Sequence, residues 1–205
     1  SELLEIVQDQ SPQDLMKLMK ISEKLGILNY ERFQELDFPI QDGMTAAYAF
    51  NGDVYQELKA IEWNATQFDF AQSHLRILSG FYGLLKPADQ ILPYRLEMGT
   101  KFLNNKGKNL YEFWGSDLSK SITRDATLTN SSQIVNLASN EYSHAINPKD
   151  VPKEWINIQF RQSKDGQLKN MGMFAKRARG MMARFAILNK FTDASELKTF
   201  NESEY

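Results

Sequence analysis

The 205-residue sequence contains no cysteine, so disulfide bridges, thiolate metal sites and cysteine nucleophiles are excluded. It contains no run of about 18 apolar residues and no secretory signal, so neither a membrane span nor export is predicted. Phosphate-loop, G-x-G-x-x-G, nucleophile-elbow and metal-triad motifs are absent as well. The signatures of the common nucleotide-binding, hydrolase and metalloenzyme classes are therefore missing.

The sequence also lacks an excess of charge of either sign. The 24 Lys and Arg residues are matched by 26 Asp and Glu residues, which gives a net charge of −2. This balance argues against a generally basic nucleic-acid-binding surface, so any anion site must be local. Hydrophobic residues make up 42% and aromatic residues 12% of the chain, which is enough to bury a sizeable core in one domain.

Positive charge is concentrated in one place, between Phe174 and Phe185. At about 100° per residue, a helix would gather four cations on one side, namely Lys176, Arg177, Arg179 and Arg184. Gly180 and Ala183 lie among these cations, and such small residues would let a phosphate backbone come close. The pattern equally fits an ordinary amphipathic helix with a solvated basic face, and both interpretations remain open.

The remaining periodicity indicates the fold class. Ser11-Pro12-Gln13-Asp14 predicts the start of a scaffold helix that carries no chemistry. Ile134 to Ser139 predicts a strand, and residues 155–160 and 168–174 predict an antiparallel pair joined by a turn at 164–166. Together these features predict a chain that contains both helices and strands.

Two glycines interrupt the helix that is predicted over residues 69–85. Gly80 and Gly83 each cost a helix about 1 kcal/mol relative to alanine, so they indicate close packing or a tight turn. A turn at Gly83 between Tyr82 and Leu84 would be similar to the hairpin of a helix-hairpin-helix unit, which offers backbone N–H groups to a DNA phosphate. A closely packed helix explains the same residues.

The segment from residue 92 to residue 101 mixes aromatic, basic and acidic side chains around one proline and one glycine. If this segment is extended, alternation puts Arg95, Glu97 and Gly99 on one side. Arg95 and Glu97 could form a buried ion pair or part of a functional site, because loops of such mixed chemistry often carry function.

A second polar cluster, Asn140-Glu141-Tyr142, follows the predicted strand. In α/β proteins functional groups often lie at this point, just after a strand. Ser139 or Asn140 could instead cap a helix there, with Glu141 favoured in its first turn. Both interpretations remain open.

Five segments distributed along nearly the whole chain carry a family resemblance. They are AFNGDVY at 49–55, LSGFYGLLKP at 78–87, PYRLEMG at 93–99, NLASNEY at 136–142 and AKRARG at 175–180. Together, and in this order, they resemble the bacterial YaaA peroxide-stress-resistance family. The ordered set is far more specific than any one motif.

The resemblance implies a single mixed α+β domain of unusual topology, with several helices around a small sheet, in a cytoplasmic protein of the oxidative-stress response. It implies a role in limiting free iron and DNA damage, and binding of duplex or branched DNA. Binding would use a helix-hairpin-helix-like element near residues 75–95 and a cationic cleft. The hairpin role then falls on Tyr82, Gly83, Leu84 and Lys86. The cleft role falls on Arg95, Lys101, Lys176, Arg177, Arg179 and Arg184.

The chain also departs from the family pattern. Family members usually begin with a strand and a Ser-Pro-Ala-Lys motif and continue into a C-terminal extension. Residues 1–205 are therefore expected to be one family domain without these terminal segments. Asn51 stands where many relatives have lysine, and Lys86 stands where many have arginine, which weakens bidentate phosphate contact at that position.

An enzyme that acts on a nucleotide or a DNA base in the same cleft is the alternative function. A carboxylate could serve as acid or base while cations hold a phosphate, and the candidate catalytic residues are Glu97, Glu141 and Tyr142. His74 and His144 form no Glu/His pair at helical spacing, so no metal site is predicted. No cofactor is predicted either.

Overall fold

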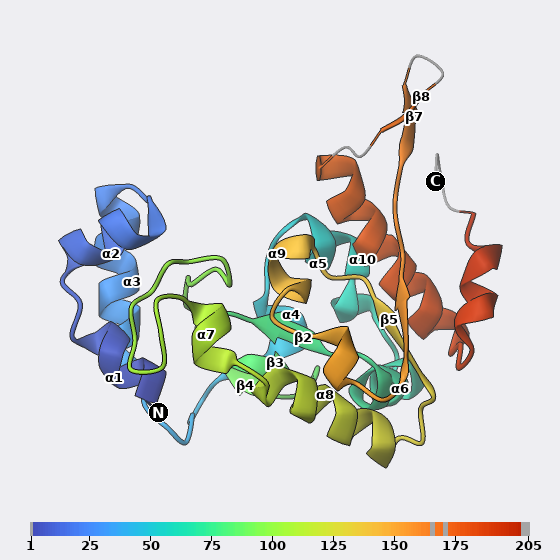
Figure 1. The fold of residues 1–205 in the computed structure, drawn as a ribbon, viewed down its shortest axis with the longest axis horizontal. Helices are drawn as coiled ribbons and strands as arrows, with labels where there is room; N and C mark the ends of the chain where they lie inside the picture. Colours follow the sequence, from blue (N-terminus) through green and yellow to red (C-terminus); the bar gives the residue numbers. More distant parts are fainter. Residues whose placement is uncertain (1, 165–166, 170–171, 202–205) are drawn as a thin grey trace.

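The computed structural model describes residues 2–164, 167–169 and 172–201 (Figure 1). Its α-helices are α1 (Glu2–Gln8), α2 (Pro12–Met19), α3 (Glu23–Glu35), α4 (Ala46–Ala49), α5 (Asp53–Leu58), α6 (Ala65–His74), α7 (Leu110–Trp114), α8 (Asp117–Leu128), α9 (Asn140–Ser143) and α10 (Gly172–Asn189). Its short 3-10 helices are η1 (Ala60–Glu62), η2 (Pro148–Asp150) and η3 (Ala194–Thr199). The predicted α+β class is confirmed.

Within the described residues the strands pair two at a time. Antiparallel pairs join β1 (Met44–Thr45) to β4 (Gln90–Ile91) and β2 (Ile77–Ser79) to β3 (Gly83–Leu85). The pair of β5 (Gln133–Asn136) and β6 (Glu154–Asn157) is parallel, and β7 (Gln162–Lys164) is antiparallel to β8 (Gln167–Lys169). The strands are thus divided among small sheets rather than gathered in one.

Helices α1, α2 and α3 stand together at one end of the molecule, and α6 and α10 lie towards the other end (Figure 1). The start of α2 is as predicted, because Pro12 occupies its first turn and the Ser11 hydroxyl accepts a hydrogen bond from the Asp14 backbone N–H at 3.2 Å. The Asp14 side chain in turn accepts from the Ser11 backbone, which completes a capping box.

Two hydrophobic clusters hold these parts together. The first joins the α1–α3 end to the centre of the molecule and includes Leu15, Phe33, Phe81, Met98 and Leu110. The second lies under α10 and includes Leu58, Trp63, Ala71, Ala183 and Ile187. The first cluster therefore fixes α2 and α3 against the loop that contains Met98.

The helix predicted over residues 69–85 is wrong beyond His74. Helix α6 ends there, and β2 and β3 form a hairpin in which Ser79 lies opposite Gly83. Gly83 turns the chain with a left-handed backbone (φ +79°), and at Gly80 the Leu96 carbonyl comes so close that a side chain would collide with it. Close packing and a tight turn are thus both present, one at each glycine.

The helix-hairpin-helix-like element expected near residues 75–95 is not found, because strands flank the turn and no helix begins within this described range. The error has a physical cause. Ile77 of β2 pairs with Leu85 of β3, and Phe81 lies in the turn between them; all three are buried. Buried residues four apart thus arise here because the chain folds back on itself, although the same spacing also fits one face of a helix. The sequence pattern alone could not separate the two.

The strand predicted from Ile134 to Ser139 is confirmed as far as Asn136, where β5 ends, but its partner was not foreseen. β6 runs parallel to β5 with Ile134 beside Trp155, so the predicted antiparallel pairing of residues 155–160 with 168–174 is wrong. The antiparallel pair is instead β7–β8, which projects from the body ahead of α10 (Figure 1). The predicted turn at 164–166 falls partly on residues 165–166, which lie outside the described residues.

Helix α10 is the helix predicted for the basic stretch, and its small residues pack against protein. At Gly180 any side chain would collide with the backbone carbonyl of Val54 in α5. Ala183 is buried in the cluster under α10. These two small residues therefore face other parts of the protein. The interpretation that they let a phosphate backbone come close is wrong.

Arg76 joins the end of α6 to α8. Its Nε donates to Asp125 Oδ2 at 2.5 Å, and its Nη1 donates to the carbonyl oxygens of Gln72, Ser73 and Leu75. The Arg76 and Asp125 side chains are 10% and 11% exposed. Arg76 thus satisfies backbone acceptors that the end of α6 would otherwise leave unpaired.

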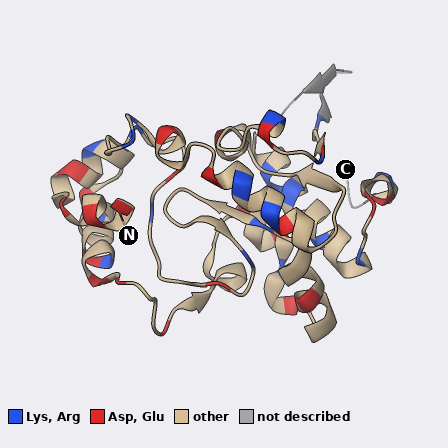
Figure 2. Cartoon of the chain, turned by 60° about the horizontal axis from the view of Figure 1, so that its bottom comes forward, with Lys and Arg blue, Asp and Glu red and all other residues tan. Residues whose placement is uncertain are grey.

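Acidic and basic residues are interspersed at both ends of the molecule (Figure 2), in keeping with the near-zero net charge. Across the described ranges, no helix has both the length and the apolarity that crossing a bilayer requires.

Gly180→Ala is expected to lower the free energy of unfolding by about 1–3 kcal/mol, measured by urea denaturation. Alanine favours a helix by about 1 kcal/mol over glycine, but here its Cβ would overpack against the Val54 backbone. Gly172→Ala is the matched control in the same helix, because a Cβ at that position has open space, and it should be neutral or stabilising. Equal effects of the two substitutions would contradict the close contact between α10 and α5.

Candidate functional site

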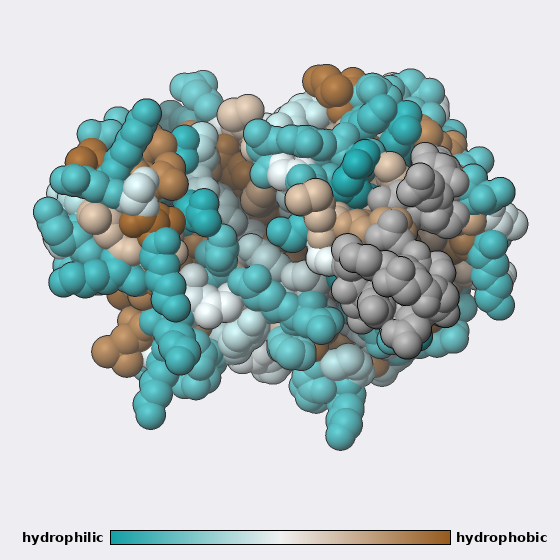
Figure 3. Space-filling model, turned by 90° about the horizontal axis from the view of Figure 1, so that it is seen from above, coloured by the Kyte–Doolittle hydropathy of each residue, from teal (hydrophilic) through white to brown (hydrophobic). Residues whose placement is uncertain are grey.

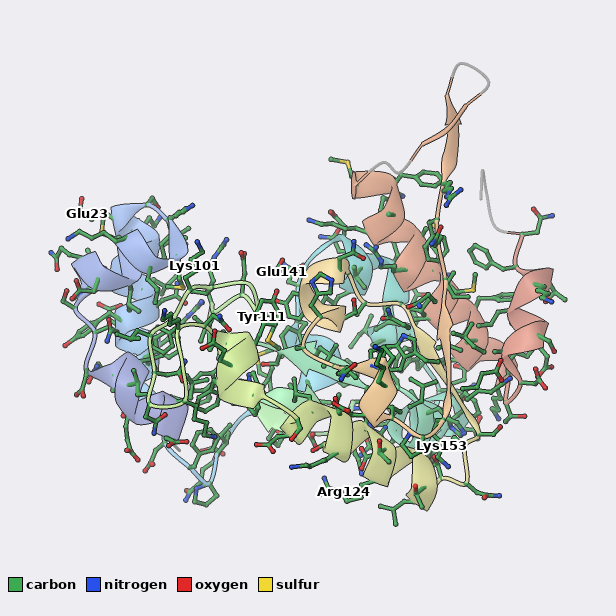
Figure 4. All side chains as sticks on the ribbon, in the orientation of Figure 1. Glu23, Lys101, Tyr111, Arg124, Glu141 and Lys153 are labelled. Atoms are coloured by element: carbon green, nitrogen blue, oxygen red, sulfur yellow. The ribbon has the colours of Figure 1, made fainter. Side chains whose placement is uncertain are left out.

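A surface groove of about 560 Å³ lies between α2, the loop over residues 95–101 and the start of α9. Figure 3 shows the surface hollowed between the α1–α3 end and the rest of the molecule, and Figure 4 shows Lys101 and Glu141 in the region between α2 and α9. The lining residues are Lys17, Leu18, Met19, Lys20, Arg95, Glu97, Gly99, Thr100, Lys101 and Glu141.

Alternating burial orients the loop that forms one wall of the groove. Leu96 is 3% exposed and Met98 is 0% exposed, and both belong to the first hydrophobic cluster. The residues that alternate with them are exposed, namely Arg95, Glu97 and Gly99. The alternation predicted for an extended segment is therefore confirmed, and it places the polar side chains in the groove.

Tyr94 anchors the start of this loop. Its hydroxyl and the buried Ser79 hydroxyl are hydrogen-bonded at 2.6 Å, and the Ser79 oxygen also accepts from the Tyr82 backbone N–H at 2.7 Å. Burial raises the pKa of Tyr94 above its usual range, so its hydroxyl stays protonated. The loop is thus tied to the β2–β3 hairpin.

Three lysines supply unpaired positive charge to the groove. Lys17 lies in the last turn of α2, Lys20 is the residue that ends this helix, and Lys101 lies at the far end of the loop. None of their ammonium groups lies within ion-pair distance of a carboxylate among the described residues, although Lys17 interacts electrostatically with Asp14 in the preceding turn of α2. With Arg95, four cations line the groove against two carboxylates, so the surplus charge attracts an anion.

Each of the two carboxylates in the groove accepts a hydrogen bond from the protein through one of its two oxygens. Glu141 Oε1 accepts from the Gly99 backbone N–H at 2.9 Å, and Glu97 Oε1 accepts from Arg95 Nη2 at 3.0 Å. The Tyr111 hydroxyl donates to the Glu141 carbonyl oxygen at 2.8 Å, which ties α9 to α7. Among described residues, Oε2 of neither glutamate accepts a hydrogen bond, so each carboxylate keeps one open acceptor.

Tyr142 follows Glu141 on α9 and is partly buried. Burial, followed by the negative charges of Glu141 and Glu97, raises the pKa of Tyr142 to about 12. Its hydroxyl therefore keeps its proton at neutral pH and can donate a hydrogen bond. The three predicted catalytic candidates Glu97, Glu141 and Tyr142 thus lie close enough to influence one another electrostatically.

The residues predicted for the hairpin role lie away from this groove. Tyr82, Leu84 and Lys86 line a separate pocket of about 340 Å³ beside Trp114 and α8. Gly83 is buried, and the Trp114 ring lies against it. The backbone of this turn is therefore covered by protein, which corrects the expectation that its N–H groups face a DNA phosphate.

The four predicted cations of α10 divide into two kinds. Arg177 Nε donates to Glu57 Oε1 at 2.6 Å, and Arg184 Nη2 donates to Glu62 Oε2 at 3.0 Å.

The other two have no such partner. Lys176 is exposed and Arg179 is half-buried, and neither forms an ion pair with a described residue. Burial lowers the pKa of the Arg179 guanidinium. Neither Lys176 nor Arg179 lines the groove. The cations beside Glu97 and Glu141 are instead those of α2 and of the loop over residues 95–101.

Sequence reasoning missed Lys17 and Lys20, because α2 was interpreted as a scaffold helix without chemistry. A pair of lysines three residues apart on an amphipathic helix is the usual pattern of a solvated face. Only the packing of α2 beside residues 95–101 brings these lysines to Arg95 and Lys101. Within the described ranges, no group of three or more acidic or histidine side chains is placed to hold a metal ion.

Comparisons with known proteins cover the whole chain. Residues 1–205 match the family described as peroxide stress protein YaaA. The chain is 49% identical over 207 residues to a UPF0246 protein of Saccharophagus degradans and 45% identical to one of Teredinibacter turnerae, each alignment covering 100% of this chain and 81% of the relative. It is 48% identical over 206 residues to a UPF0246 protein of Shewanella baltica, covering 100% of this chain and 80% of the relative.

Glu141→Ala should loosen the loop over residues 95–101, which forms one wall of the groove. Because the substitution removes the acceptor of the Gly99 N–H, amide hydrogen exchange at Gly99 should become about fivefold faster, as expected for removing a hydrogen bond worth about 1 kcal/mol. Glu141→Gln retains an acceptor oxygen and should leave the exchange rate nearly unchanged. An unaltered Gly99 exchange rate in Glu141→Ala would contradict the described hydrogen bond.

Proposed function

Because this chain belongs to the peroxide stress protein YaaA family, we propose that it binds duplex or branched DNA as part of the oxidative-stress response. The family resemblance of the five sequence segments is confirmed by the match over the whole chain. In this proposal the DNA-bound protein helps limit iron-dependent damage to the DNA. The groove and the unpaired cations of α10 supply the contacts.

The observation that carries the proposal is the set of unpaired ammonium groups in one groove. Lys17, Lys20 and Lys101 converge there from α2 and from the loop. Phosphates of the DNA backbone would pair with them and release condensed counterions, which is the main source of sequence-independent DNA affinity. Arg95 would contribute less, because Glu97 already offsets part of its charge.

Lys176 and Arg179 form a second proposed contact. The Arg179 guanidinium is partly desolvated without a carboxylate partner among described residues, so a phosphate would lower the electrostatic cost of its burial. Arg177 and Arg184 should contribute less because Glu57 and Glu62 already pair with them. We propose structure-dependent binding rather than sequence reading, because phosphate contacts carry no base information.

Replacing Lys17, Lys20 and Lys101 together by alanine should weaken duplex binding by about 10- to 100-fold at low salt. It should also lower the slope of log affinity against log salt by about 0.9 for each phosphate that the variant no longer neutralises. Fluorescence anisotropy with duplex and four-way-junction DNA at two salt concentrations measures both quantities. Lys149→Ala is the matched control, because Lys149 is an exposed lysine of η2 outside the groove. Equal affinity of the triple variant and the control would contradict the groove as the binding site.

An enzyme that acts on a nucleotide or a DNA base is the second candidate. The observation that favours it is the proximity of Glu97, Glu141 and the protonated Tyr142, which could supply a base and an acid beside phosphate-binding cations. Mass spectrometry of nucleotides and oligonucleotides after incubation separates the two candidates. Chemical change that Glu97→Gln abolishes supports the enzyme, whereas binding without chemical change supports the first proposal.

A further inference from the structure

A phosphate backbone that pairs with the lysines of the groove leaves the two carboxylates of the groove without a favourable partner. Glu97 and Glu141 lie among cations that would attract phosphates, and each carboxylate repels a phosphate at the same distance over which a lysine attracts it. A groove that bound only phosphates would be better lined by cations and neutral donors. The carboxylates therefore indicate a ligand that also carries a hydrogen-bond donor.

Glu97 and Glu141 are placed to receive such a donor. Each is fixed through one oxygen, by Arg95 Nη2 and by the Gly99 N–H, and each leaves Oε2 without a partner among described residues. An ionised carboxylate is acceptor-only, and its hydrogen bond from a hydroxyl is among the stronger kinds. The acceptors are thus held in position before any ligand arrives.

The size of the groove limits the ligand to a small unit. About 560 Å³ is in the range of pockets that take a small molecule, so the groove has room for one nucleotide. Within one deoxynucleotide, the phosphate and the 3′-oxygen lie on opposite sides of the sugar. A strand end with a free 3′-hydroxyl therefore offers an anion and a donor within one nucleotide.

We propose that the groove preferentially binds the end of a DNA strand that carries a free 3′-hydroxyl. Lys17, Lys20 and Lys101 hold the terminal phosphates, while Glu97 Oε2 accepts the single hydrogen bond that the hydroxyl donates and the charge of Glu141 adds to the negative potential around it. Inside an unbroken strand the 3′-oxygen is esterified and has no proton to donate, so the preference distinguishes strand breaks from intact backbone. This inference rests on the DNA binding proposed above and adds the chemical group that the groove recognises.

The test uses one duplex with a two-nucleotide 3′ overhang in three forms that differ only at the last 3′ position, which carries a hydroxyl, a hydrogen or a phosphate. Wild-type protein should bind the hydroxyl end about tenfold more tightly than the 3′-deoxy end, the difference expected for one hydrogen bond to a charged group. The 3′-phosphate end should bind most weakly despite its additional negative charge. Binding is measured by anisotropy with a label at the distant 5′ end.

Glu97→Ala should bring the three affinities within about twofold of one another. Glu141→Gln, which preserves the contact to Gly99 but removes a charge, should reduce the preference partly. Glu31→Ala is the control, because Glu31 is an exposed carboxylate of α3 outside the groove, and it should retain the wild-type preference. Thermal melting of each variant verifies that the fold persists.

The outcomes separate this inference from the proposed function. If the three ends bind equally, or if preference follows the terminal base, while the triple lysine variant still binds every DNA more weakly, strand-end recognition is overturned and DNA binding stands. If no oligonucleotide binds with salt-dependent affinity, both proposals are overturned. Tightest binding of the 3′-phosphate end would show that the groove responds to charge alone and would also overturn the inference.

Discussion

Burial of Leu96 and Met98 is the constraint on which the candidate site depends. With both side chains in the first hydrophobic cluster, the extended loop must direct Arg95, Glu97 and Gly99 outwards. The same cluster contains Leu15 of α2, so one core fixes both walls of the groove. Tyr94 and Glu141 then tie the loop at its two ends, through Ser79 and through the Gly99 N–H. Side chains from distant parts of the sequence thus converge through packing rather than through sequence proximity.

Some cations of this protein pair with carboxylates of the protein itself, and others are left to interact with a ligand. Arg76 closes the end of α6 and pairs with Asp125, and Arg177 and Arg184 pair with carboxylates of α5 and η1. The lysines of the groove have no such partners among described residues. A stretch rich in cations is therefore a poor guide to an anion site by itself, because carboxylates that lie far away in sequence can neutralise it.

The sequence predicted local features well where the signal lay within a few residues. The cap at Ser11, the strand that includes Ile134 and the alternation of Arg95, Glu97 and Gly99 are confirmed. It failed where a hairpin places buried residues at helical spacing, as at Ile77, Phe81 and Leu85, and where the partner of a strand is distant, as for β6. The wall formed by Lys17 and Lys20 could not be predicted, because it exists only once α2 packs beside the loop. The role of Gly180 could not be predicted for the same reason, since its partner Val54 lies in another helix.

Lysine-specific acetylation, quantified by mass spectrometry with and without saturating duplex DNA at low salt, tests the central claim most directly. Lys17, Lys20 and Lys101 are reactive in free protein if their ammonium groups are unpaired, and DNA should reduce their labelling several-fold. Lys149, exposed on η2, should label equally in both conditions. Undiminished labelling of the groove lysines in the presence of bound DNA, or protection no greater than that of Lys149, would contradict the account.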